Sequence, residues 1–362
     1  MSLIRLTGRP RILAIRADRL GDVVLSIPTF EVLKRTYPQA HLCVWVQPRV
    51  APIVRGLPFV DEVVEIEPEQ LSLAALYRLA RAGRWDLALV LQPRFKIAAA
   101  LWLARIRHRI GPLSKLYSFL LFTAGIRQRR SRVEMHEADY NLQLLQLLGV
   151  EVGSRTVLPR VAVSTEARAE AHAFWKGQEA RHWVAIHPGM GGSALNWPEG
   201  HYLELARLLL EKGLGVVVTG GPAEQPVLDR FSHELESKHA GRFACFGGAR
   251  AASVDRLAAV FERVSVVVAP STGPLHVASA LGKPVVTFFP PIRVQSARRW
   301  GPYVGDTPGA PRGSSPASVL VPEVHCGQDF KCRGQACPYH PCMPTLSVAQ
   351  ALEMVQNHLA RV

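Results

Sequence analysis

The sequence predicts two α/β domains in tandem, each with a parallel sheet covered by helices on both faces. The first observation is length, because a chain of 362 residues exceeds the size at which one hydrophobic core keeps growing. The second is a regular alternation of short apolar runs with helix-length segments, which is the pattern of parallel β-α-β units. The third is that this alternation starts twice, on either side of a segment of mixed polarity around residues 151–168. A cleft is expected where the carboxyl ends of the two sheets face each other.

Each half of the chain contributes five apolar runs of strand character. In the first half they cover residues 11–17, 41–47, 60–66, 87–93 and 107–111. In the second half they cover residues 182–189, 214–221, 243–248, 264–271 and 284–291. A final helix is predicted after the capping residue Ser347, because helical spacing relates the apolar residues Leu346, Val348, Leu352, Val355 and Leu359.

The composition excludes a disordered or membrane-spanning chain. Hydrophobic residues make up 48% and charged residues 20% of the sequence, as expected of a folded protein. The apolar stretch at residues 97–110 is interrupted by Arg105 and Arg107, so it falls short of the ~20 residues needed to cross a bilayer. The first residues do not have the pattern of a signal peptide, and we therefore expect a cytoplasmic protein.

A net charge of +14 indicates an acidic partner, and nucleic acid, anionic lipid and phosphorylated substrates all qualify. Arginine is concentrated in the first half, around residues 105–109 and 127–132, which indicates a patch, although an ordinary solvated surface stays open as an alternative. The basic runs have no interleaved aromatic residues and no helix-turn-helix or zinc-finger spacing, so nucleic acid is not the expected partner.

Four of the six cysteines lie close together near the end of the chain. They are Cys326, Cys332, Cys337 and Cys342. A structural zinc site and reduced thiols are both open interpretations, because the spacing lacks paired CxxC motifs. The other two, Cys43 and Cys245, lie in strand-like runs and are expected to be small core residues.

The stretch RADRLGDVVLSIP, residues 16–28, places three charged residues between two apolar runs: Asp18, Arg19 and Asp22. Aspartate caps helices and Gly21 allows a turn, so a purely structural role is open beside a functional one.

Two loops of the second half have the character of phosphate-binding segments. Residues 187–198, HPGMGGSALNWP, form a glycine-rich turn after a strand, before a helix that we expect to begin near Pro198 and to end at Gly213. In the second loop, Ser271 and Thr272 precede Gly273, and Pro274 stands in the first turn of a helix. Free amides at such a helix start suit a phosphate, whereas short turns without a ligand remain the alternative.

In this order, the segments RADRLGDVVLSIP, HPGMGGSALNWP, TGGPAEQ and STGPLHVASALGKPVV resemble glycosyltransferase family nine, the lipopolysaccharide heptosyltransferases and their relatives. The resemblance implies a GT-B fold of two doubly wound, Rossmann-like domains facing across a cleft. It further implies an acceptor-binding domain at residues 1–165, a nucleotide-sugar-binding domain at 166–345, and a helix at 346–362 that returns to the N-terminal domain.

The resemblance also implies roles for individual residues. Asp22 corresponds to the catalytic base of an inverting transfer, and Glu224 to an acidic residue on the donor ribose. The other donor-binding positions that it implies are Ser193, Ser271, Thr272, Gly273, Pro274, Leu275 and His276. Basic residues facing a phosphorylated acceptor would be Arg19, Arg94 and Lys96, together with the run at residues 105–109.

The function expected from this resemblance is transfer of heptose from ADP-heptose to a phosphorylated inner-core glycolipid, at the inner face of the inner membrane. No metal or other cofactor is implied beside the nucleotide sugar. Leu195 stands where well-known heptosyltransferases have Lys, and Ser271 where they have Asp, so a transferase for another nucleotide sugar in O-antigen or glycolipid synthesis stays open. A non-catalytic relative that only binds nucleotide sugars is a further alternative.

Overall fold

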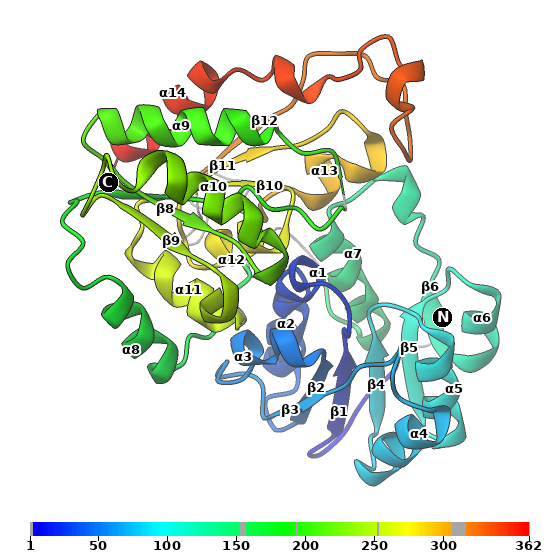
Figure 1. The fold of residues 1–362 in the computed structure, drawn as a ribbon. Helices are drawn as coiled ribbons and strands as arrows, with labels where there is room; N and C mark the ends of the chain where they lie inside the picture. Colours follow the sequence, from blue (N-terminus) through cyan, green and yellow to red (C-terminus); the bar gives the residue numbers. More distant parts are fainter. Residues whose placement is uncertain (1–2, 152–156, 193, 252, 306–315, 362) are drawn as a thin grey trace. The chain divides into compact units, whose positions relative to one another are not determined.

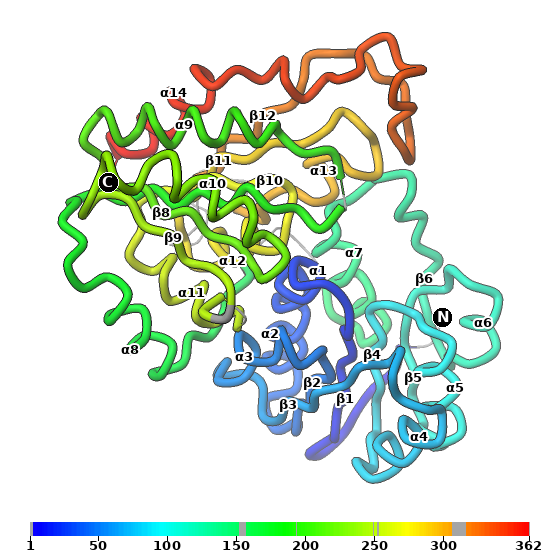
Figure 2. Tube along the Cα trace, in the orientation of Figure 1, coloured from blue at the N-terminus to red at the C-terminus, as the bar shows by residue number. Residues whose placement is uncertain are grey.

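The computed structural model describes residues 3–151, 157–192, 194–251, 253–305 and 316–361. The chain divides into two compact units (Figure 1). The N-terminal unit comprises residues 1–130 and 134–162, and the C-terminal unit comprises residues 131–133, 163–305 and 309–362. The trace in Figure 2 follows the first unit from blue to cyan-green and the second from green to red.

The N-terminal unit is built on a six-stranded sheet in which every strand is parallel to its neighbours. Its order is β3-β2-β1-β4-β5-β6. The strands are β1 (Arg11–Ile15), β2 (His41–Val46), β3 (Glu62–Glu65), β4 (Leu87–Val90), β5 (His108–Pro112) and β6 (Ala124–Ile126). The strand order reverses between the neighbours β1 and β4. Strands β2 and β3 lie on the far side of β1, and strands β5 and β6 lie on the far side of β4.

Helices of this unit pack on the sheet through apolar stripes. They are α1 (Leu20–Val24), α2 (Ile27–Thr36), α3 (Ala51–Val54), α4 (Leu73–Ala82), α5 (Phe95–Leu103), α6 (Leu116–Leu121) and α7 (Glu137–Gln143). Alternate strand residues share one face of a sheet. Here the face that packs against α4 and α5 is formed by Leu13, Ile15, Cys43, Trp45, Ala88 and Val90.

The C-terminal unit has a second six-stranded parallel sheet, of order β12-β11-β10-β7-β8-β9. The strands are β7 (Trp183–Ile186), β8 (Gly215–Thr219), β9 (Phe243–Phe246), β10 (Val266–Pro270), β11 (Val285–Phe288) and β12 (Ala317–Leu320). The strand order reverses between β7 and β10. All ten predicted strands are confirmed, and the two strands that were not predicted, β6 and β12, lie at sheet edges.

The helices of the C-terminal unit are α8 (Thr165–Phe174), α9 (Glu199–Glu211), α10 (Gln225–Leu235), α11 (Val254–Arg263), α12 (Gly273–Ala280), α13 (Ala297–Trp300) and α14 (Val348–Leu359). The predicted cap of the last helix is confirmed, since Ser347 Oγ accepts from Gln350 N at 3.2 Å. The return of this helix to the N-terminal domain, which the resemblance implies, stays a prediction. Within the C-terminal unit, α14 packs against α9, β10 and β11, and its apolar residues Ala351 and Val355 are part of the core of this unit.

Candidate active site

The N-terminal unit gathers charged side chains where the order of its sheet reverses. Asp18, Arg19 and Asp22 follow β1, and Gln92 and Arg94 follow the neighbouring strand β4. The carboxyl ends of parallel strands meet at one edge, and ligands of such sheets bind at this edge, beside the reversal. The charged stretch that follows β1 therefore stands where a binding site is expected.

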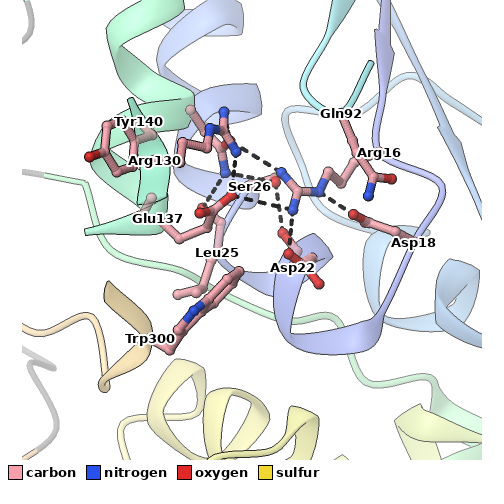
Figure 3. A network of polar contacts seen from close by, with 12 residues as sticks. Arg16, Asp18, Asp22, Leu25, Ser26, Gln92, Arg130, Glu137, Tyr140 and Trp300 are labelled. Atoms are coloured by element: carbon pink, nitrogen blue, oxygen red, sulfur yellow. Dashed lines mark hydrogen bonds and ion pairs between the residues drawn. The ribbon is translucent and has the colours of Figure 1, made fainter. Parts of the chain in front are cut away.

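Arg16, the residue after β1, is the centre of a network of polar contacts at this edge (Figure 3). Its side chain is only 2% exposed, and its Nε donates to Asp18 Oδ1 at 2.9 Å. Its Nη2 donates to Asp22 Oδ1 and lies 3.5 Å from Glu137 Oε1. A buried charge is tolerated where it is paired and hydrogen-bonded. Burial alone would lower the pKa of Arg16, but these three carboxylates raise it above its ordinary value, so the guanidinium stays charged.

Helix α7 supplies the far side of the network. Glu137 and Asn141 are four residues apart and therefore lie on one face of this helix. Asn141 Oδ1 accepts from Arg16 Nη1 at 3.2 Å, and Asn141 Nδ2 donates to Ser26 Oγ at 3.1 Å. A second guanidinium, that of Arg130, also contacts Glu137 (Figure 3). The network thus fixes the segment after β1 against a helix that is more than 110 residues away in the sequence.

Asp22 lies in the first turn of the short helix α1, and its side chain is 17% exposed. Burial raises the pKa of Asp22 to about 6, Arg16 acts against this rise, and the like charges of Asp18 and Glu137 add to it. Ser26 Oγ donates to the backbone oxygen of Asp22 at 2.7 Å, which holds the turn. A carboxylate whose pKa lies just below neutral pH is ionised under physiological conditions and is still a competent proton acceptor.

Asp22 opens onto a pocket of about 390 Å³ within the N-terminal unit. The pocket is lined by Asp18, Arg19, Asp22, Gln47, Arg49, Gln92 and Arg94. Of the predicted acceptor residues, Arg19 and Arg94 are therefore at the pocket. Lys96 is not among its lining residues, because Lys96 Nζ points to the backbone oxygens of Pro68, Glu69 and Leu71 at 3.3–3.4 Å.

Three lining residues were not predicted, namely Gln47, Arg49 and Gln92. Gln47 and Arg49 follow β2, the strand beside β1, and Arg49 Nε donates to Gln47 Oε1 at 3.0 Å. Their position after a predicted strand was the available signal. The pocket combines three guanidinium groups with two carboxylates and so suits a ligand that carries both hydroxyl and anionic groups.

In the C-terminal unit, glycines allow Glu224 to approach two loops closely. Glu224 ends the 3-10 turn Pro222–Glu224 after β8. A Cβ atom on Gly189 would lie 2.7 Å from Glu224 Cγ, and one on Gly220 would lie 2.9 Å from Glu224 Cβ. Because such distances are sterically forbidden, only glycine permits this arrangement, in which the carboxylate lies over the loops that follow β7 and β8.

The second predicted phosphate-binding loop leads into α12. Thr272 is the N-cap, Gly273 begins the helix, and Pro274 stands in its first turn, as predicted. Ser271 to Pro274 are partly exposed, whereas the side chains of Leu275 and His276 are buried, at 0% and 4% exposure. The predicted donor role of Leu275 is therefore limited to its backbone. Ser193 lies outside the described residues.

His187 was not predicted as a site residue. It follows β7 at the base of the glycine-rich loop, and its Nδ1 lies 2.9 Å from Thr219 Oγ1 at the end of β8. Burial lowers the pKa of His187 to about 4, so the imidazole is neutral at physiological pH. Trp197 anchors the other end of the loop, because its ring stacks on Phe288 and its Nε1 donates to Leu346 O at 2.7 Å.

The cysteine segment gives the zinc hypothesis no support. All six cysteines of the chain are free. Within the described residues, which include the four cysteines between 326 and 342, no three His, Cys, Asp or Glu side chains are grouped so that they could hold a metal ion. Cys43 is a buried core residue as predicted, and Cys245 is half-buried in β9.

The model of "Glycosyltransferase family 9 (heptosyltransferase)" matches residues 73–308. The chain belongs to this family. The chain is 29% identical over 302 residues to a protein of Haemophilus influenzae named "Putative glycosyltransferase", covering 81% of this chain and 86% of that protein. It is also 26% identical to lipopolysaccharide heptosyltransferase 2 of Salmonella typhimurium, covering 78% and 83%. The family 9 chain is thus a glycosyltransferase related to enzymes of lipopolysaccharide synthesis.

Solved structures confirm the fold class. The family 9 glycosyl transferase of Veillonella parvula matches with a TM-score of 0.81 at 20% identity, covering 99% of this chain and all of that one. The E. coli ADP-heptose lps heptosyltransferase II matches with a TM-score of 0.78 at 22% identity, covering 97% and 99%. With its two six-stranded parallel sheets, this family 9 enzyme therefore has the predicted GT-B fold. Among its described residues, no helix is long and apolar enough to cross a bilayer.

Proposed function

We propose that this glycosyltransferase transfers heptose from ADP-heptose to a phosphorylated lipopolysaccharide inner-core acceptor, with inversion at the anomeric carbon and with Asp22 as the base. The observation that carries the proposal is the Asp22 carboxylate, which borders a pocket rich in arginine and has a pKa raised to about 6. The family match begins at residue 73, so the role of Asp22 rests on this geometry and on the resemblance of its segment.

The pocket supports a phosphorylated acceptor. Arg19, Arg49 and Arg94 present guanidinium groups, which bind phosphate through paired, charge-assisted hydrogen bonds. Gln47 and Gln92 add amide groups that suit sugar hydroxyls. An acceptor whose phosphate is held by the arginines would bring a sugar hydroxyl to Asp22.

In the proposed step, Asp22 takes the proton of that hydroxyl as its oxygen forms a bond to the anomeric carbon of the donor. The bond from this carbon to the diphosphate oxygen breaks, and ADP leaves from the opposite face, so the configuration inverts and no covalent intermediate forms. The leaving diphosphate gains negative charge, which the backbone amides and the dipole at the start of α12 would stabilise. Glu224 would accept hydrogen bonds from the ribose hydroxyls.

The relatives support this choice of donor and acceptor. The E. coli structure is named for ADP-heptose, and the Salmonella relative is named for lipopolysaccharide. In this proposal the donor is a nucleotide sugar and the acceptor is a glycolipid. The reaction would therefore take place in the cytoplasm, at the inner face of the inner membrane. No further cofactor is required in the proposed step.

A second candidate is transfer of a different nucleotide-linked sugar in O-antigen or other glycolipid synthesis. The observation that favours it is the pair of departures at Leu195 and Ser271, which replace a lysine and an aspartate expected beside the phosphates and the sugar. A non-catalytic relative that keeps only nucleotide-sugar binding is the third possibility. The raised pKa of the Asp22 carboxyl, which suits a proton acceptor, argues against it.

Two measurements on the full-length protein test the proposal. Calorimetric titration with ADP-heptose, with other ADP-linked sugars, and with UDP- and GDP-sugars identifies the donor, and we expect ADP-heptose to bind with the highest affinity. Transfer to a phosphorylated inner-core acceptor is then followed by mass spectrometry, with the anomeric configuration of the product assigned by NMR. Preference for a UDP- or GDP-sugar would favour the second candidate. Donor binding without turnover, on any acceptor of the series, would favour the non-catalytic one.

A further inference from the structure

We propose that helices α5 and α6 form a docking surface for an anionic lipid bilayer. This inference deepens the proposed function, on which it rests for the presence of a membrane-bound acceptor. The surface, which we call the α5–α6 face, is defined by six exposed apolar side chains, which are Phe95, Trp102, Leu103, Leu116, Phe119 and Leu120. Both helices belong to the N-terminal unit, and they pack against each other in it (Figure 1).

Helix α6 exposes an apolar stripe on its outer face. Leu116, Phe119 and Leu120 stand at spacings of three and four residues, and they are 83%, 52% and 76% exposed. The buried residue of this helix is Ser118, whose Oγ has no hydrogen-bond partner among the residues that the structure describes. Tyr117 and Leu121 are half-buried and pack against the core of the N-terminal unit, whereas the other three apolar residues of this helix face outward. A surface helix normally buries its apolar stripe, so this exposed stripe indicates an apolar environment outside the protein.

Specific contacts hold the exposed helix in this orientation. Tyr117 packs edge-on against Phe95 with ring centroids 5.6 Å apart, and its hydroxyl donates to Pro93 O at 2.9 Å. At the other end of α6, Arg109 Nε donates to Leu121 O at 2.7 Å. Because both ends are tied to neighbouring segments, the apolar stripe is presented on a fixed support and joins the exposed end of α5.

The positive charge of this region favours binding to an anionic bilayer. Between Leu87 and Arg130 the sequence has nine lysines and arginines and no aspartate or glutamate. Of these, Lys96, Arg105, Arg107 and Lys115 are exposed within or beside the two helices. Apolar side chains rimmed by basic residues are the usual composition of a surface that inserts between lipid headgroups. A second protein copy with this same basic rim would be repelled, and for this reason we commit to lipid.

The position of the face fits a lipid-linked acceptor. Arg94, which lines the pocket beside Asp22, is also the N-cap of α5, whose first residue is Phe95. One helix therefore connects the docking surface with the acceptor pocket. A glycolipid whose acyl chains remain in the bilayer would have its sugar end near this pocket while the α5–α6 face contacts the headgroups.

The test is co-sedimentation of the full-length protein with vesicles of phosphatidylcholine, alone or mixed with phosphatidylglycerol. We expect binding to the mixed vesicles, weakened by salt because charge attraction is screened. The triple variant Leu116→Ser, Phe119→Ser, Leu120→Ser should lower the partition coefficient roughly tenfold or more through lost apolar insertion. Each neutralisation at Arg105, Arg107 or Lys115 should lower it about fivefold on the mixed vesicles only.

The matched control is the double variant Phe330→Ser, Tyr339→Ser, which removes aromatic side chains of 58% and 44% exposure from the C-terminal unit. It should bind vesicles as the parent does. Quenching of Trp102 fluorescence by brominated lipid should accompany binding and disappear in Trp102→Phe, which reports insertion of this face in particular. Nucleotide affinity and the melting temperature are measured for every variant to show that it is folded.

Failure of the docking proposal is separable from failure of the proposed function. Transfer to an acceptor dispersed in detergent should be unchanged in the triple variant, because that assay needs no bilayer. Vesicle binding by the triple variant at the level of the parent, or no binding by the parent, would overturn the docking surface even if transfer proceeds. Self-association that the triple variant abolishes, with vesicle binding unaffected, would assign the face to a second copy and would also overturn it.

Discussion

Replacing Asp22 by Asn should lower the rate of transfer by orders of magnitude and at the same time stabilise the fold near neutral pH. In the folded protein the pKa of Asp22 is about 6, whereas that of an aspartate exposed to water is 3.8. Between these two values the folded state binds a proton that the unfolded state has released. The stability that this carboxyl contributes is therefore complete below about pH 4 and is lost as the pH rises through about 6.

The magnitude follows from the shift. About two pKa units at 1.4 kcal/mol each give an upper limit of about 3 kcal/mol for the destabilisation by the ionised carboxylate above pH 6. The charges agree in direction, since the like charges of Asp18 and Glu137 add to the rise in the pKa of Asp22. Because the Asn side chain also weakens the contact with Arg16, we expect a net gain of about 1–2 kcal/mol.

The assay is denaturant unfolding of the parent and of Asp22→Asn between pH 4 and pH 8, together with transfer kinetics. The variant should be more stable than the parent at pH 7.5, and the difference should vanish toward pH 4. Transfer should fall by about 10²–10⁴, the usual contribution of a general base, while donor affinity stays within a few-fold. Asp229→Asn, at an exposed carboxylate on α10, is the matched control and should show no such pH dependence. A variant that is less stable than the parent at pH 7.5 would refute the argument from desolvation, and loss of donor binding with turnover intact would refute the role of base.

Three further outcomes are expected. Glu137→Gln removes a like charge near Asp22, so the acid limb of the kcat/KM profile should move to lower pH by about one unit, as measured with ADP-heptose in excess; an unmoved limb would assign that limb to another group. Arg49→Gln should raise KM for a phosphorylated acceptor several-fold, with KM for the nucleotide sugar nearly constant, and the defect should shrink with a dephosphorylated acceptor and at high ionic strength; equal effects on both substrates would remove Arg49 from the acceptor pocket. Transfer should persist in EDTA, because the amides at the start of α12 stabilise the leaving diphosphate, and a strict requirement for magnesium would contradict this step.

The sequence was sufficient to predict the strands that are buried on both faces. The central strands β1, β4, β7 and β10 are continuous apolar runs, since a central strand of a parallel sheet is covered by helices on both sides. Of the four edge strands, β3 and β9 were also predicted, whereas β6 and β12 give no such signal. β6 has three residues, and β12 has exposed or half-buried side chains throughout, so neither stands out from a turn by its pattern.

The candidate site was predictable only in part. Charged and glycine residues after a strand drew attention to the segments that hold Asp22, Ser271 and Thr272, because function concentrates in loops at the carboxyl edge of such sheets. The roles proposed for these residues come from the family resemblance. Arg16 could not be recognised in this way, since a charged residue after a strand is usually solvated. Glu137 and Asn141 share a helix face, which the four-residue spacing indicates, but the sequence gives no means of pairing that face with a loop 115 residues earlier.

The burial of Arg16 explains why the proposed base needs so many partners. A lone buried carboxylate would take up a proton and lose its function at neutral pH, whereas a lone arginine beside it would lower its pKa and weaken it as a base. Asp18 and Glu137 share the charge of Arg16, so the arginine keeps Asp22 ionised without removing its basicity. The three carboxylates thus share the charge of Arg16, and Arg130 also contacts one of them, Glu137. Neutralising Asp18 or Glu137 should strengthen the hold of Arg16 on Asp22, and the resulting enzyme should work at lower pH but more slowly at its plateau.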